Sequence, residues 1–457
     1  MNLLVKDKSF YKKMAVIAIP ISLQSMITIG VNMTDTVMVG KLGETSLSAT
    51  ALANQFVNIY QICCMGIAMG ASVLTSRFWG MQDITSLKKT ITLMLRLCIV
   101  LAVLFMLPTI LIPQLLMRMY TNDSAVIAQG VQYFKWMVYC YFLQGMTMTC
   151  TIVLRSVGQV NFPLFTSIGS FFVNILFNYM FIFGKLGVPR MEVEGAGVGT
   201  LIARVFEFSL ICGYFLFVDR KIGYRLKDLR MKCNSLIKDY VSISIPVFVS
   251  DSLLALGTSA VAMVMGRIGT GFVSANSITV VTQQLTTVVI QGICHAGCIM
   301  TGHTLGHGER EKAQQQAWTF LILGLVVGIL GGGLIKVLSR PIIGLYNITP
   351  ETAQIAGELM DAIAFIVIFQ SMNSILTKGV LRGGGDTKFL MVADIIFLWA
   401  ASLPLGILAG LVWHLDAFWI YVFLKIDQIC KSIWCVFRLR SGKWIKTFSK
   451  EKMNHAQ

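Results

Sequence analysis

Three long stretches of this chain contain no Asp, Glu, Lys or Arg. They cover residues 45–76, 272–308 and 313–335. A helix needs roughly 20 apolar residues to cross the ~30 Å hydrocarbon layer of a bilayer, so each stretch is long enough to span a membrane. With 55% hydrophobic and 13% charged residues among 457, the chain has too little polar surface for a soluble globule of its size. We therefore predict an all-α integral membrane protein.

Similar apolar segments recur along the whole chain and predict about twelve transmembrane helices. We place them at 14–40, 45–76, 90–117, 125–154, 159–184, 195–218, 239–266, 272–304, 313–336, 352–380, 388–412 and 416–437. The first segment runs on to Asp35 without a small-residue cleavage pattern, so we expect no cleaved signal peptide.

The net charge of +16 could indicate nucleic-acid binding, but the position of the charges indicates membrane orientation instead. Lys and Arg concentrate in loops on one side, namely both ends of the chain and the segment 219–238. Cytoplasmic loops carry this excess in multi-pass proteins. We expect both termini in the cytoplasm, a cell-membrane location and no nucleic-acid partner.

The two halves of the sequence repeat one another, at an offset of 226 positions at first and of 227 further on. Pro20 begins PISLQSMITIGVNMTDTVMVGKLG, and Pro246, 226 positions later, begins PVFVSDSLLALGTSAVAMVMGRIG. The segment VLRSVG ending at Gly158 matches VLRGGG ending at Gly385. Each repeat holds about six spans, an even number, so the repeats are expected to be parallel and related by an axis along the membrane normal. We predict an N-terminal six-helix bundle at 1–218, a cytoplasmic basic linker at 219–238 and a C-terminal bundle with its tail at 239–457.

Asp35 is the most informative ionisable residue within a span. Its repeat equivalent is the apolar Val261. Placing a carboxylate at bilayer depth costs free energy, so its presence there indicates a functional role. Such a group could alternate between protonated and ionised or cation-bound forms, which suits ion coupling. The alternative is a structural carboxylate near the outer interface.

Asn174 and Asn178 lie four residues apart in NILFNYMFIFG, so both amides share one helix face and could contact one partner. Hydrogen bonding between helices is the alternative, because Asn commonly does this in membranes. Thr200, in GAGVGT, could join either arrangement.

Polar candidates in the second half are less clear. Asp251 could bind a cation or substrate, or it could be a structural residue satisfied by Gln283, Gln284 or Gln291. We expect Arg204 and Glu207, three residues apart, to form a local ion pair. Four further charged residues near span ends are expected to be architectural: Lys378, Asp394, Lys425 and Asp427.

No pattern in the sequence indicates enzyme chemistry. His303 and His307 have a metal-ligand spacing but no third ligand placed by sequence, and the 11 Cys show no CxxC pair. We expect no cofactor, no metal site and no catalytic residue.

These segments together resemble the multidrug and toxic compound extrusion (MATE) family, and the resemblance covers nearly the whole chain. It implies a bacterial, NorM-like transporter with two six-helix bundles in a V-shaped fold. It also implies antiport of Na⁺ or H⁺ against small organic, often cationic, compounds, with membrane lipid as the surrounding medium and no obligate protein partner.

The resemblance places Asp35 on the family's first-helix carboxylate, and Asn174, Asn178 and Thr200 on the polar cluster of the fifth and sixth helices. Asn178 is NorM-like, since the DinF-like branch usually has Asp there. The second-half acids of NorM-like members would fall at Leu254 and Ser371, the latter beside Gln370 and Asn373. The cation site is therefore expected in the first bundle.

Two other function classes remain open from the sequence. One is a flippase or exporter of a single lipid-linked or metabolic substrate on a related fold, and the other is a channel, receptor or membrane enzyme. A flippase cavity should be strongly charged to hold a phosphate head group. Arg204 is the only clear arginine that we place in the central spans, which favours a multidrug exporter.

Overall fold

The computed structural model describes residues 4–344 and 348–447, and these ranges contain helices and loops but no strand. Eleven helices in them are long and apolar enough to cross a membrane. At the predicted twelfth span there are instead two shorter helices, α14 (Ala417–Leu424) and α15 (Ile426–Arg440), which meet at Lys425. The all-α membrane fold is confirmed, and a single turn residue, Lys425, divides the predicted twelfth span.

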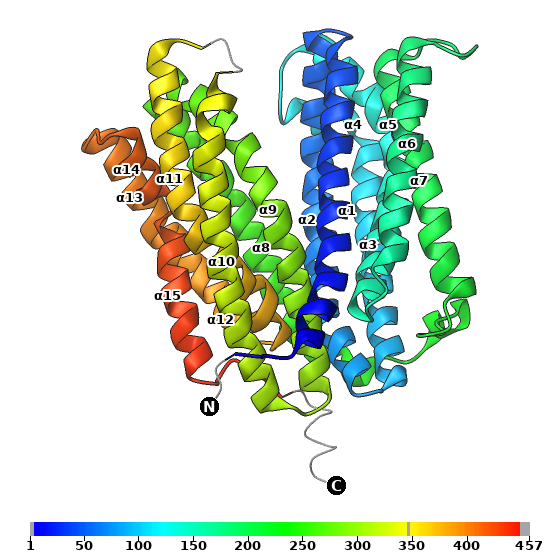
Figure 1. Ribbon diagram of the computed structural model, residues 1–457. Coiled ribbons are helices and arrows are strands. Elements are labelled where there is room, and N and C mark those ends of the chain that lie inside the picture. The colour runs from blue at the N-terminus through cyan, green and yellow to red at the C-terminus, as the bar shows by residue number, and fades with distance from the viewer. Residues whose placement is uncertain (1–3, 345–347, 448–457) are drawn as a thin grey trace. The chain divides into compact units, whose positions relative to one another are not determined.

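The first half of the chain forms helices α1 to α7 (Figure 1). Their bounds are α1 Lys8–Gly40, α2 Glu44–Gly80, α3 Ile84–Leu111, α4 Pro113–Arg118, α5 Ser124–Ser156, α6 Asn161–Phe183 and α7 Glu192–Gly213. A π-helical segment, Tyr214–Val218, extends α7, and a short 3₁₀ helix, Leu226–Arg230, precedes the second half.

The second half forms helices α8 to α15. Their bounds up to α13 are α8 Asn234–Ile268, α9 Thr270–Gly306, α10 Arg310–Ile343, α11 Pro350–Ser374, α12 Thr387–Asp394 and α13 Leu403–Ile407. Three π-helical segments extend these helices: Ile375–Leu381 after α11, Ile395–Ser402 after α12 and Leu408–Val412 after α13. Such segments disturb the regular hydrogen-bond ladder and are frequent at functional sites.

Helix boundaries follow the 226-residue register of the repeat. α2 and α9 are both 37 residues long and begin directly after Gly43 and Gly269, respectively. Glycine ends the VLRSVG and VLRGGG segments in a left-handed conformation, with φ of 80° at Gly158 and 85° at Gly385. Only glycine adopts this conformation without strain, so the same residue ends the equivalent helix in each half.

The described helices group into two compact units. The N-terminal unit is Leu23–Ser244, and the C-terminal unit is Ile245–Gln457 together with Met1–Ser22. The beginning of α1 thus belongs with the second half of the chain. The Phe10 ring packs edge-on against Phe320 of α10 at 5.6 Å, and the backbone N–H of Val5 donates to Thr319 Oγ1 at 3.0 Å.

The predicted basic linker is packed against α3 rather than extended. Lys88 of α3 pairs with Asp228 at 3.0 Å, and the Arg96 guanidinium donates to the Leu229 carbonyl at 2.6 Å. Partial burial raises the pKa of Asp228, but the Lys88 ammonium and the backbone N–H of Arg225 outweigh it and hold that pKa below its usual range. The predicted basic tail beyond residue 447 lies outside the described residues.

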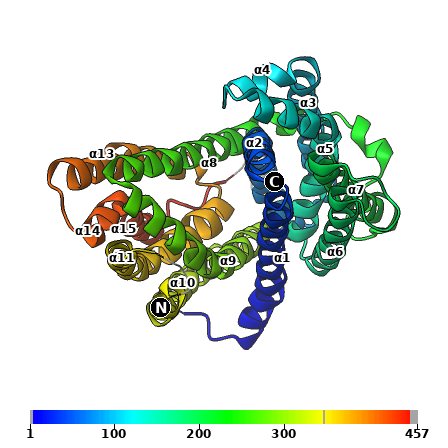
Figure 2. The same ribbon diagram turned by 90° about the horizontal axis from the view of Figure 1, so that it is seen from above.

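The core of the N-terminal unit lies between α2, α3 and α5. Tyr60 of α2 donates its hydroxyl to the Tyr141 carbonyl at 2.5 Å, and the two rings lie 5.0 Å apart. α6 packs along α7 on the other side of α5 (Figures 1 and 2). Val57 and Met137 belong to this core and also line the cavity described below, so the core fixes one wall of the candidate site.

Candidate functional site

The structure brings Asp35 of α1 together with the two asparagines of α6. Asn178 Nδ2 donates to Asp35 Oδ1 at 2.7 Å and also lies 3.3 Å from Asn174 Oδ1. Both asparagines are almost fully buried, with 3% and 1% of their surface exposed, while Asp35 is half-buried. The i, i+4 spacing in α6 therefore places both amides on the face that meets the α1 carboxylate.

Asn178 occupies this position because α7 presents a glycine opposite it. A Cβ atom added at Gly199 would lie 2.8 Å from the backbone nitrogen of Asn178 and closer still to its side-chain oxygen. That oxygen has no hydrogen-bond partner among the described residues. Small residues at helix interfaces allow this close approach. The GAGVGT segment of α7 therefore determines where the Asn178 side chain lies relative to Asp35.

Asp35 lies on the wall of a cavity of about 320 Å³ within the N-terminal unit. α2 contributes Asn54 and α5 contributes Tyr133, whose hydroxyl donates to Asn54 Oδ1 at 3.2 Å. Asn174 and Asn178 do not line this cavity and stand behind the carboxylate. The arrangement therefore exposes one carboxylate to the cavity and supports it from behind with amides.

Two residues of α7 also line this cavity. Thr200 does so, but none of the described contacts joins its side chain to Asp35 or to either asparagine. Arg204 pairs with Glu207 at 2.6 Å, so the local ion pair expected from their spacing is confirmed. Glu207 therefore provides a carboxylate partner for the Arg204 charge within the same cavity wall.

The polar candidates of the second half form small separate contacts within the C-terminal unit. Asp251 pairs with Arg382 at 3.0 Å, so a partner among Gln283, Gln284 and Gln291 is wrong. Gln283 donates instead to Gln370 at 2.8 Å. The side-chain amide of Asn373 donates to Gln428 at 2.8 Å, and the side chain of Gln284 is exposed.

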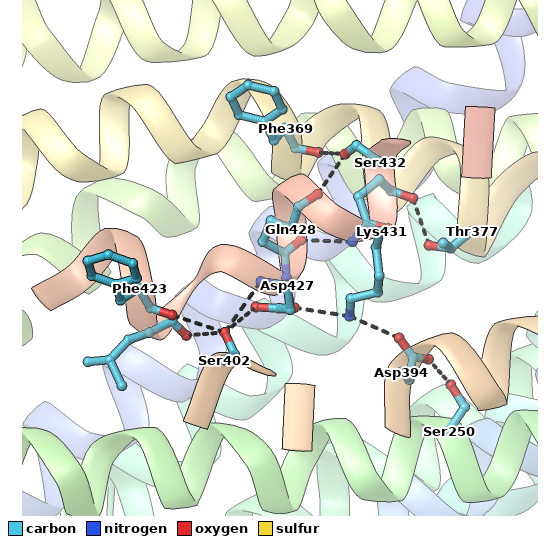
Figure 3. Close-up of polar contacts among 12 residues, drawn as sticks. Ser250, Phe369, Thr377, Asp394, Ser402, Phe423, Asp427, Gln428, Lys431 and Ser432 are labelled. Carbon is cyan, nitrogen blue, oxygen red and sulfur yellow. Dashed lines mark hydrogen bonds and ion pairs between the residues drawn. The ribbon is translucent and has the colours of Figure 1, made fainter. Parts of the chain in front are cut away.

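The structure also contains a buried ionic network that the sequence reasoning missed (Figure 3). Lys431 of α15 lies between Asp394 and Asp427 at 3.0 Å from each, and all three side chains are at least nine-tenths buried. Arg77 and Arg382 are buried too, and Arg77 lies within the span of α2, so Arg204 is not the only arginine in the spans. Lys431 and Asp427 are four residues apart in α15, and this spacing is the sequence feature from which their ion pair could have been predicted.

Comparison with known proteins agrees with this architecture. The MatE family model matches residues 20–180 and 246–429, which are the two repeats. A Thermotoga maritima protein named "Probable multidrug resistance protein NorM" is 24% identical over 441 residues, covering 95% of this chain and 93% of that protein. The Bacillus subtilis protein "Uncharacterized transporter YisQ" is 24% identical over 419 residues, covering 90% of each.

Solved structures share the fold at low sequence identity. The Vibrio cholerae MATE transporter VcmN, solved as a mutant, has a TM-score of 0.86 at 16% identity, with 95% of this chain and 97% of that chain covered. A MOP superfamily transporter from Pyrococcus furiosus has a TM-score of 0.83 at 19% identity, with the same coverage. The matched proteins are transporters, and the family model covers both repeats, so this chain belongs to the MatE family, as the sequence motifs predicted.

Proposed function

We propose that this protein is a secondary active antiporter that exports organic, often cationic, compounds in exchange for Na⁺ or H⁺ by alternating access. The observation that carries the proposal is the Asp35 carboxylate, which faces a cavity of about 320 Å³ and is held by Asn178 at 2.7 Å. The multidrug-resistance names of relatives such as the Thermotoga maritima protein support the same function.

The coupling site of this proposal consists of Asp35, Asn174, Asn178 and Thr200. The carboxylate supplies negative charge, and amide and hydroxyl oxygens can complete the shell of Na⁺, which prefers oxygen ligands as other hard cations do. A proton on Asp35 would neutralise the same charge. With one carboxylate in the cluster, either cation removes the buried charge and allows the helices around it to repack.

The cavity itself supports recognition of an organic cation. Asp35 provides a counter-charge, and Tyr133 and Met137 provide an aromatic ring and a flexible thioether that can adapt to different ligands. Because cation and substrate would use the same carboxylate, they would compete for it. This competition is the physical basis of exchange in the proposal.

The proposal includes the orientation and division of the chain. Both termini and the 219–238 linker face the cytoplasm of a cell membrane, and the repeats 1–218 and 239–457 are the two bundles that move during transport. The excess of Lys and Arg at these positions supports the orientation. The protein acts as a transporter without a cofactor or obligate protein partner and not as an enzyme.

The experiment is efflux of ethidium, a permanently charged organic cation, from proteoliposomes under separately imposed Na⁺ and H⁺ gradients. We expect one gradient to drive efflux and Asp35→Asn to reduce it at least about tenfold, because the coupling charge is lost. Asp361→Asn is the matched control, since Asp361 lies in α11 but pairs with Lys336 in a largely exposed ion pair. Near wild-type gradient-driven efflux by Asp35→Asn would refute the assignment.

A further inference from the structure

A second cavity, of about 200 Å³, lies inside the C-terminal unit beside the network of Figure 3. Its wall combines apolar side chains of α8 and α12, including Leu254 and Leu390, with charged residues. The charged residues come from the segment after α11, the end of α12, the turn at Lys425 and α15. The sequence resemblance would place an acid of a cation site at Leu254, which carries no charge. This cavity therefore lacks the carboxylate that the resemblance would place there.

The two carboxylates on its wall are already occupied. Asp394 accepts from Lys431 Nζ at 3.0 Å and from the Ser250 hydroxyl. Asp427 accepts from the same ammonium at 3.0 Å and from Gln428 Nε2 at 2.6 Å, as Figure 3 shows. Neither carboxylate is left to attract a further cation.

Three cationic side chains on the same wall retain unused donors. The ammonium groups of Lys378 and Lys425 make no hydrogen bond or ion pair with any described residue. Arg382 uses one nitrogen for Asp251, but its Nε–H is buried and has no partner within the described ranges. A buried donor without a partner is costly, so the Arg382 Nε–H lacks an acceptor, and the two lysine ammonium groups beside it are free to share one.

The charge balance points the same way. Four cationic residues line the cavity, Lys378, Arg382, Lys425 and Lys431. Three carboxylates offset them when Asp251, the partner of Arg382, is included: Asp251, Asp394 and Asp427. One positive charge remains inside a partly apolar enclosure, where a bound monoanion would compensate it.

We propose that this cavity binds an anionic group, the carboxylate or phosphate of a small organic compound, through Lys378, Lys425 and the Arg382 guanidinium. The volume is sufficient, since a cavity of about 150 Å³ can hold benzene. The apolar wall favours an organic anion over a free inorganic one. The inference rests on the proposed function only in one respect, namely that the bound compound is one the protein exports.

The experiment measures binding of benzoate to the purified full-length protein by calorimetry, without any gradient, so its result is independent of the efflux test. Benzyl alcohol, which has the same ring without the charge, is compared on the wild-type protein. We expect benzoate to bind and benzyl alcohol to bind at least about tenfold more weakly, because hydrogen bonds to charged groups are the strong ones.

Variants then locate the site. We expect Lys378→Met and Lys425→Met each to weaken benzoate binding about tenfold or more, and Lys425→Arg to retain it. Lys388→Met is the matched control, because Lys388 is an exposed lysine of the same unit. Inorganic phosphate that binds as tightly as benzoate, with the same loss in the variants, would support the anion site and assign it to the free ion. Equal binding of benzoate and benzyl alcohol, or equal affinities in all three Met variants, would overturn the proposal.

Discussion

Replacing Gly199 with alanine tests whether close approach of α6 and α7 controls the coupling site. The added methyl group would lie 2.8 Å from the Asn178 backbone nitrogen and 3.0 Å from its Cα. Such distances to backbone atoms are too short to be relieved by a side-chain rotation, so α6 must move away from α7. Asn178 would then shift relative to Asp35, and the hydrogen bond of 2.7 Å would lengthen or break.

Overpacking of this kind costs about 1–3 kcal/mol. For a unit of this size that corresponds to a fall of roughly 2–12 °C in the unfolding midpoint. Loss of a hydrogen bond to a charged group corresponds to a change of about tenfold or more in ion affinity. The assays are thermal unfolding of the purified protein and gradient-driven efflux at graded coupling-ion concentrations.

Gly213→Ala is the control for this prediction. Gly213 is in the same helix, but a Cβ there would meet no atom within 4 Å. We expect Gly213→Ala to retain wild-type stability and ion dependence. If Gly199→Ala matches Gly213→Ala in both assays, the close contact with Asn178 does not govern the site and the reasoning fails.

Three further predictions follow from other contacts. If Na⁺ drives transport, Asn178→Ala should raise the Na⁺ concentration for half-maximal transport about tenfold or more. Asp251→Asn should change this concentration only modestly. The reverse order of the two variants in efflux assays would move the site to the C-terminal unit. Lys431→Met leaves two buried carboxylates without their shared cation and should destabilise the protein by about 3–5 kcal/mol in denaturant unfolding, and an unchanged midpoint would contradict the network. The pKa of Asp228 is below its usual range in the folded protein. Its pairing with Lys88 should therefore stabilise the protein at pH values above the unfolded-state pKa of about 3.9. This stabilisation should be lost as the pH falls through the pKa of Asp228 in the folded protein. Asp228→Asn should flatten this part of the stability profile, and an unchanged acid limb would exclude the pair as its source.

The sequence was sufficient to predict the membrane helices and the repeat. Span length depends only on consecutive apolar residues, and the 226-residue register is visible in the amino-acid order itself, in the segments that begin at Pro20 and Pro246. The shared face of Asn174 and Asn178 could also be predicted, because the i, i+4 relation is a property of one helix. The contact of Asn178 with Asp35, 143 positions apart, was expected only through the family resemblance.

Tertiary structure decided which charges are compensated. Asp251 was expected either to bind a cation or substrate or to lie beside glutamines, but it pairs with Arg382, 131 positions away. Lys378 and Lys425 were expected to be architectural near span ends, and the structure places both on the wall of the cavity of about 200 Å³. Their surroundings are set by helices that are distant in sequence, and the energy of a buried charge depends on the nearest opposite charge in space. Apolar length is additive along the chain, whereas charge compensation depends on distances that exist only after the helices pack.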